Sequence, residues 1–204
     1  MKYFSTIAFV LIFITNSMAQ ESMAQESMDK EKLPYYEVAD YSEVSYTAGS
    51  VVARMIDGLG FRYRWATEDL RDEDLTYRIT DSSRTSIETI DHILGLSRVI
   101  VNATKQVPTD FTIEHPTLTF KEKRKETLAN LERASRNLIT AQTLEDFNIQ
   151  FIYKGGESEY PFWNNINGPI ADAIWHCGQV VMLRRGSGNP LRKGVSFLKG
   201  QVKE

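Results

Sequence analysis

The chain has 204 residues, of which 42% are hydrophobic and 25% are charged, enough for one hydrophobic core and short for two domains. The formal net charge of -3 and the pI of about 5.7 argue against a nucleic-acid-binding protein, because such proteins carry a basic face. Cys177 is the single cysteine, which excludes an intrachain disulfide.

The first 19 residues are typical of a secretory signal peptide. The start is positively charged, residues 3–15 are almost entirely apolar, and Ser17-Met18-Ala19 places small residues where a signal peptidase cleaves. The apolar run is shorter than the roughly 20 residues that a membrane-spanning helix needs, although an anchored helix is the alternative. We therefore predict an exported bacterial protein, either periplasmic or secreted.

Residues 20–45 are polar and predict a linker or an N-terminal strap ahead of a domain at residues 46–204. Within this segment, residues 18–22 are repeated as residues 23–27, so that Ser22-Met23-Ala24 offers a second cleavage site. No later apolar run is long enough to cross a membrane, and we expect no span in the mature chain.

A first helix is predicted at residues 47–70, because apolar residues recur there at steps of three and four. These residues are Val52, Met55, Ile56, Leu59, Tyr63, Ala66 and Leu70. The acidic tract at residues 68–74 is expected to be a solvated helix end and turn. A calcium-binding loop in this tract is disfavoured, because the EF-hand spacing is absent.

A second helix is predicted to open at Thr85, where Glu88 three residues later completes a capping box. It continues through Val101 and is apolar around nearly its whole circumference. Such a helix is expected to lie between neighbouring helices and not at the rim.

A third helix is predicted from Thr119, which forms a capping box with Glu122, to about Ala141. The run at residues 121–126 mixes both signs of charge. We therefore interpret it as a solvated helix face and not as a nucleic-acid-binding patch.

Residues 147–153 alternate apolar and polar side chains and precede Gly155-Gly156, which predicts a short strand or extended arm that ends in a turn. A fourth helix is predicted at residues 162–185 and ends at Gly186. Gly168-Pro169 marks either its true start or a kink. Four such helices predict an all-α, up-and-down four-helix bundle, with the extended arm between the third and fourth helices.

Three polar residues stand at positions that the helical pattern assigns to the interior. Asp172 and His176 are four residues apart on the fourth helix and therefore share a face whose flanking positions are apolar. Burying an unpaired carboxylate costs on the order of several kcal/mol, so a partner is needed. His92, among core-facing positions of the second helix, is the natural partner. Two imidazoles and one carboxylate suit a divalent metal such as Zn, Ni or Fe(II).

The alternative is a structural network, in which His176 and Asp172 hydrogen-bond each other, or His92 only accepts a hydrogen bond in the core. His115 lies in a loop and is expected to be exposed, so a metal site would use the other two histidines. Cys177 is expected to be a small core residue and not a nucleophile. Asn165 and Gln179 are candidates for orienting a substrate, and Trp175 is a candidate for lining a pocket.

Several segments together resemble the DinB/YfiT-like superfamily. Ile170-Ala-Asp-Ala-Ile-Trp-His-Cys-Gly-Gln179, followed by Leu183-Arg-Arg-Gly186, resembles its last helix, in which a histidine pair four residues apart precedes Gly-Gln. Asp91-His92-Ile-Leu94 resembles the motif of its second helix, and Trp65-Ala-Thr-Glu-Asp-Leu70 resembles the end of its first helix. The resemblance covers about residues 48–198.

The resemblance implies a metal-binding four-helix bundle, often a homodimer, with metal ligands at His92, Asp172 and His176. This chain departs from the family at Asp172, where histidine is usual, and aspartate is a harder ligand that leaves the metal open. Some family members are metal-dependent transferases that use a low-molecular-weight thiol. Such thiols are mostly cytosolic, which fits an exported chain less well. The resemblance gives no reason to expect DNA binding.

Three functions follow as hypotheses. The first is a metal-dependent hydrolase or transferase that acts on a small molecule. The second is a non-catalytic binding or stress-related module of the cell envelope, in which the polar residues form a structural network. The third is a purely structural or partner-docking bundle, which predicts an apolar patch on the outside of the helices.

Overall fold

The computed structural model describes residues 33–203, and residues 34–203 belong to one compact unit. The predicted signal peptide, both of its cleavage sites and residues 20–32 of the predicted linker lie outside the described residues. Most of the regular structure is helical: α2 (Ala48–Ala66), α3 (Asp72–Thr76), α4 (Ser86–Thr104), α5 (Phe120–Leu138), α6 (Trp163–Asn165), the π-helical η1 (Ile166–Ile170) and α7 (Ala171–Gly186). None of the helices in this part of the chain is both long and apolar enough to span a membrane.

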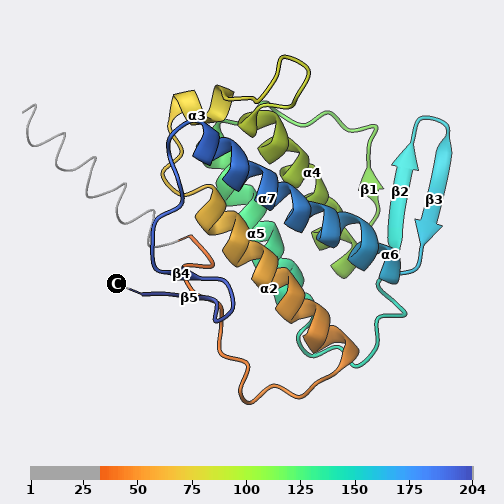
Figure 1. Cartoon of the computed structure of the whole chain (residues 1–204). Helices are drawn as coiled ribbons and strands as arrows, with labels where there is room; N and C mark the ends of the chain where they lie inside the picture. Colours follow the sequence, from red (N-terminus) through yellow and green to blue (C-terminus); the bar gives the residue numbers. More distant parts are fainter. Residues whose placement is uncertain (1–32, 204) are drawn as a thin grey trace, which may run out of the picture. The chain divides into compact units, whose positions relative to one another are not determined.

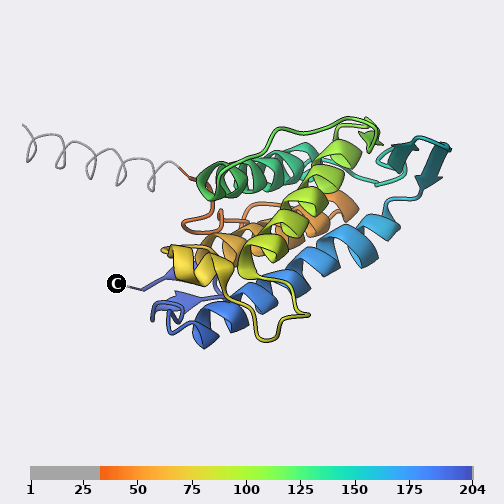
Figure 2. The same cartoon turned by 90° about the horizontal axis from the view of Figure 1, so that it is seen from above.

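The long helices α2, α4, α5 and α7 lie side by side (Figures 1 and 2). Helices α2 and α4 each pack against both α5 and α7. Their interior is fully buried and mainly aliphatic, and includes Ile56, Leu59, Ile93, Ile100, Leu128, Leu131 and Leu138. The predicted position of α4 between neighbouring helices is therefore confirmed.

Capping boxes start the first three of these helices. The side-chain oxygens of Thr47, Thr85 and Thr119 accept from the backbone N–H three residues later. Two of these boxes were predicted from the Thr and Glu spacing. Since the cap satisfies backbone donors that the first turn leaves unpaired, these three starts are the most precisely predicted boundaries of the fold.

Helix α2 ends at Ala66 and not at the predicted residue 70. The buried guanidinium of Arg184 donates to the carbonyl oxygens of Trp65 and Ala66, both at 3.1 Å. These bonds satisfy carbonyl groups that the last turn leaves without helical partners. A second departure concerns Met55, which the periodicity placed on the buried face and which is 37% exposed.

Two segments that were predicted to be solvated are largely exposed or partly exposed, but each contains one buried charged residue. Glu68 lies in an ion-pair cluster with Arg64, at 3.2 Å, and with Arg124. Arg124 belongs to the mixed-charge run, yet it is buried because Thr67 and the carbonyl of Arg64 also accept from it. Asp74, in the acidic tract, is fully buried. Charge patterning identified these segments as polar, but it did not show that some of their charged side chains pair in the interior.

A small sheet corrects the all-α prediction. The predicted strand is β2 (Ile149–Tyr153), which pairs antiparallel with β3 (Gly156–Tyr160) and parallel with β1 (Thr109–Asp110). The hairpin lies at one end of the helices, and α3 lies at the other (Figures 1 and 2). The C-terminal tail contains a second short pair, β4 (Val195–Ser196) and β5 (Gln201–Val202).

The predicted irregularity at Gly168-Pro169 is the π-helical segment η1, which joins α6 to α7. Pro169 has no backbone N–H, and the N–H of Ala171 bonds to the carbonyl of Ile166, five residues earlier. The helix therefore continues through Pro169, but the π-helical turn shifts the residues after it around the helix axis. This shift helps to set the direction of the side chains in α7.

Residues 34–44 strap onto α2, as the linker prediction allowed. The Tyr35 ring lies against Gly60, where an added Cβ would be 2.3 Å from the ring. The hydroxyls of Tyr35 and Tyr41 donate to the carboxylate of Asp57, which is buried on α2. Gly60 is thus required by packing, although it lowers the helix propensity.

Replacing Gly60 with alanine should destabilise the protein, because the new methyl group meets the Tyr35 ring. We expect the free energy of unfolding to fall by about 1–3 kcal/mol in urea denaturation. The matched control is Gly95→Ala on α4, where nothing lies within 4 Å of an added Cβ. That change should raise stability by up to about 1 kcal/mol, and equal effects at both glycines would contradict the strap contact.

Candidate metal centre

His92 of α4 and Asp172 and His176 of α7 meet at one point, as predicted. His92 Nε2 lies 3.1 Å from Asp172 Oδ2, and His176 Nε2 lies 3.3 Å from Asp172 Oδ1. The two imidazole rings are nearly perpendicular, with centroids 4.6 Å apart. One ligand atom from each residue lies within 4.8 Å of the other two, so the group is close enough to hold a metal ion.

The exposure of this trio differs from the prediction of a buried site. The side chains of His92 and Asp172 are 36% and 38% exposed, whereas that of His176 is 11% exposed. The helical pattern identified the shared face correctly, but this part of the face lies at the seam between α4 and α7 and not in the core. The argument that Asp172 needs a partner because it is buried is therefore wrong. An open seam instead gives the trio access to solvent and to small molecules.

Gln179, one turn after His176, fixes the orientation of that imidazole. Its Oε1 lies 2.8 Å from His176 Nδ1, and in this orientation of the amide it accepts a hydrogen bond and places the proton of a neutral imidazole on Nδ1. The lone pair of Nε2 then faces a carboxylate oxygen of Asp172, which is also an acceptor. Two acceptors this close are stable only with a proton or a cation between them. A hydrogen bond from the outer nitrogen to an oxygen is the usual support of a metal-bound histidine.

A π-helical segment directly precedes the turn of α7 that carries Asp172. Its last residue, Ile170, is two residues before Asp172, and the extra residue per turn changes which side of the helix Asp172 occupies. Such single-turn π segments often occur at functional sites. The proline that the sequence showed only as a possible kink therefore helps to aim the carboxylate.

Asp91, the neighbour of His92 in sequence, is not part of the trio. Its Oδ1 pairs with Lys123 Nζ of α5 at 2.5 Å. This pair directs the acidic side chain toward α5. Asp172 therefore supplies the single carboxylate of the three-residue site.

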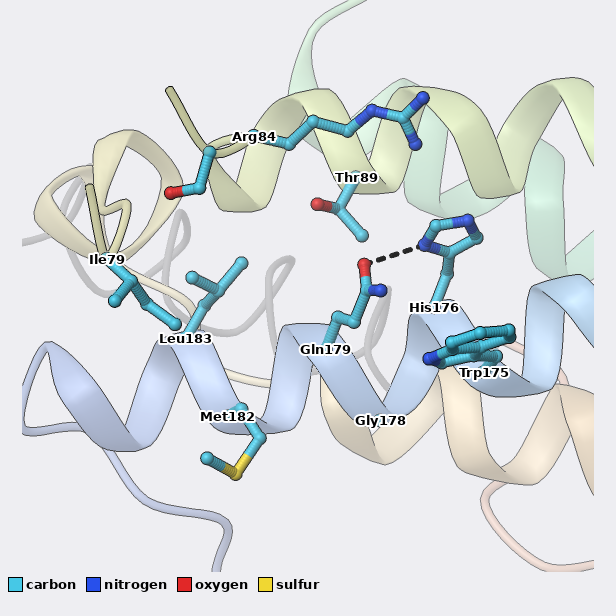
Figure 3. Close-up of a pocket in the computed structure, with 10 residues that line it drawn as sticks. Ile79, Arg84, Thr89, Trp175, His176, Gly178, Gln179, Met182 and Leu183 are labelled. Atoms are coloured by element: carbon cyan, nitrogen blue, oxygen red, sulfur yellow. Dashed lines mark hydrogen bonds between the residues drawn. The ribbon is translucent and has the colours of Figure 1, made fainter. Parts of the chain in front are cut away.

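A groove of about 760 Å³ adjoins the trio and shares His176 with it (Figure 3). It is lined by Ile79, Ser83, Arg84, Thr89, Trp175, His176, Gly178, Gln179, Met182 and Leu183. Volumes of this order are typical of small-molecule sites. The lining includes Trp175 and Gln179, which the sequence had suggested as pocket residues, and also the 79–84 loop, which nothing in the sequence linked to the histidines.

Three other residues considered in the sequence analysis lie elsewhere. Asn165 does not line the groove: it is fully buried, and its amide atoms have no hydrogen-bond partner within the described residues. Cys177 is also buried, and burial raises the pKa of its thiol to about 12. The thiol is therefore protonated at neutral pH, which agrees with the predicted core role. His115 is exposed, as expected.

Asp74 anchors the segment that leads to the groove. Its carboxylate accepts from Arg71 at 2.8 Å, from Ser187 at 2.6 Å and from Asn189 at 2.7 Å. These hydrogen bonds, first that from Arg71, hold the pKa of Asp74 well below its usual range. The bonds join α3 to the end of α7, and the chain leaves α3 directly into the loop that contributes Ile79 and Arg84 to the groove.

Replacing Asp74 with asparagine should lower the free energy of unfolding by about 2–4 kcal/mol at pH 7, because it removes the buried charged acceptor on which Arg71, Ser187 and Asn189 converge. Because the pKa of Asp74 is lower in the folded than in the unfolded protein, its carboxylate stabilises the fold fully only above the unfolded-state pKa, near 3.9. This stabilisation is lost as the pH falls toward the folded-state pKa. The difference between the two proteins, measured by denaturation, should therefore narrow below about pH 4. Asp81→Asn, at an exposed loop position, is the control. An undiminished difference at pH 2 would contradict this role.

Comparisons with known proteins identify no relative: no family model matches the chain, and neither does any curated protein or solved structure. Any function must therefore be argued from the site itself.

Proposed function

We propose that this chain is an exported four-helix bundle of the DinB/YfiT-like type that binds one divalent metal ion through His92, Asp172 and His176. The metal is Zn, Ni or Fe(II), and the activity is that of a metal-dependent hydrolase or transferase for a small molecule. The observation that carries this proposal is the convergence of two imidazoles on one carboxylate from two helices.

The donor set fits such a metal. The distances of 3.1 and 3.3 Å from the imidazole nitrogens to the carboxylate oxygens approach the separation of about 3.3–3.4 Å expected between ligands of a tetrahedral zinc ion with bonds of 2.0–2.1 Å. Gln179 supplies the supporting hydrogen bond to His176. Three protein ligands leave a coordination position for a water or a substrate, which is the pattern of a catalytic site.

A bound metal would act as a Lewis acid and lower the pKa of a coordinated water or thiol. The residues of the chain have separate tasks around it. Gln179 orients His176, and Asp172 supplies the negative charge that makes the site favourable for a cation. The open seam and the adjoining groove give a substrate access to the centre.

The second candidate is a non-catalytic envelope module in which the trio is a structural network. It is favoured by the direct contacts of Asp172 with both histidines, which link α4 to α7 without a metal. With the opposite orientation of the Gln179 amide, His176 would accept at Nδ1 and donate from Nε2 to Asp172. This candidate predicts stability that is independent of metal.

Metal titration separates the two candidates. Protein purified without a metal-affinity tag should take up one equivalent of Zn, Ni or Fe(II), measured by elemental analysis after dialysis. At 100 times the dissociation constant, the bound ion adds about 2.7 kcal/mol, which corresponds to a rise in melting temperature of roughly 5–10 °C. His176→Ala should lose both the metal and the rise.

The remaining histidine provides a matched control. His115→Ala removes an exposed imidazole and should retain metal and thermal shift unchanged. Asp172→His, which restores the histidine usual in the family, should still bind one equivalent. Wild-type protein without metal and without stabilisation by any of these ions would refute the metal site and leave the structural network.

A further inference from the structure

We propose that the groove beside the trio is the substrate site of the metal centre and that it takes a small organic anion with an apolar body. The identification of this ligand as a substrate rests on the proposed metal function. The evidence for the binding site itself is the chemistry of the groove wall.

One side of the groove is apolar and exposed. Ile79 is 68% exposed and Met182 is 58% exposed, and Leu183 lies beside Ile79 in Figure 3. Trp175, which is 72% exposed, flanks His176 at the other end of the groove. Apolar side chains placed together on a concave surface favour a ligand that covers them, because the covered area is removed from water.

The charge of the groove comes from Arg84. None of the 10 lining residues is acidic, and Arg84 has no ion-pair partner within residues 33–203. Glu88, which follows Arg84 by four residues, forms no ion pair with it: its Oε2 accepts from the backbone N–H of Thr85 at 2.7 Å, and the charge of Arg84 acts on it only at longer range. The guanidinium is thus left available for a carboxylate or phosphate, which it binds through paired hydrogen bonds.

The direction of Arg84 orients the ligand. In Figure 3 its side chain runs along α4, over Thr89, toward the end of the groove where His176 lies. The apolar residues Ile79 and Leu183 occupy the opposite end. An anionic group at Arg84 would therefore lie toward the metal centre, and the apolar body would extend along α7 toward Ile79.

Titration by nuclear magnetic resonance tests this site with hexanoate, hexyl phosphate, 1-hexanol and acetate. The indole N–H signal of Trp175 and the amide signal of Gly178 report on the groove. We expect both six-carbon anions to shift these signals and to bind more tightly than hexanol, whereas acetate should not bind. The carboxylate and phosphate probes show which anionic group the groove prefers.

Arg84→Gln should weaken binding of the anions by about threefold to tenfold and leave hexanol unchanged. Arg185→Gln removes an exposed charge of α7 outside the groove and is the matched control. Met182→Glu should also weaken binding of the anions, because it places a negative charge on the apolar wall of the groove. Equal binding of hexanoate and hexanol, or no effect of Arg84→Gln in folded protein, would overturn the proposal.

The same titration with zinc-loaded and metal-free protein separates this inference from the proposed function. Metal uptake without anion binding would overturn the proposed anion site in the groove and leave the proposed metal centre intact. Anion binding that depends on Arg84, without metal uptake, would support the groove and refute the metal-dependent activity. The proposal would also be overturned if the groove binds no anion because a second copy of the chain covers it. Sedimentation would show this if Met182→Glu turns a dimer into a monomer.

Discussion

The Asp172 carboxylate joins the two halves of the candidate centre, because each of its oxygens contacts an imidazole from a different position in the chain. His92 reaches it from α4, and His176 reaches it from one turn further along α7. The arrangement depends on the packing of α4 against α7 and on the register that the π-helical segment imposes before Asp172.

The identity of the trio was predictable from sequence, because helical spacing places Asp172 and His176 on one face and the family resemblance pairs them with His92. Its depth was not predictable. Periodicity shows which face of a helix is covered, but neighbouring segments decide how far each position along that face is from solvent. For this reason His92 and Asp172 were expected in the core and are more than one-third exposed.

Capping boxes located helix starts to within a residue, because a Thr and a Glu three positions apart satisfy specific backbone donors. Interior ion pairs were missed for the opposite reason. Arg124 and Asp74 stand in segments of high charge, and only the fold brings Glu68 to the first, and Ser187 and Asn189 to the second. The groove was missed in the same way, since the loop that contributes Arg84 has no local pattern that links it to α7.

The coordination of zinc itself tests the account most directly. X-ray absorption of the zinc-loaded protein should show nitrogen and oxygen ligands at about 2.0–2.2 Å, with the multiple-scattering signal of two imidazoles. His92→Ala should remove one of these imidazoles. Since Cys177 is buried and protonated at neutral pH, no sulfur ligand at about 2.3 Å is expected. A first shell without imidazole, or one that His92→Ala leaves unchanged, would contradict the proposed centre.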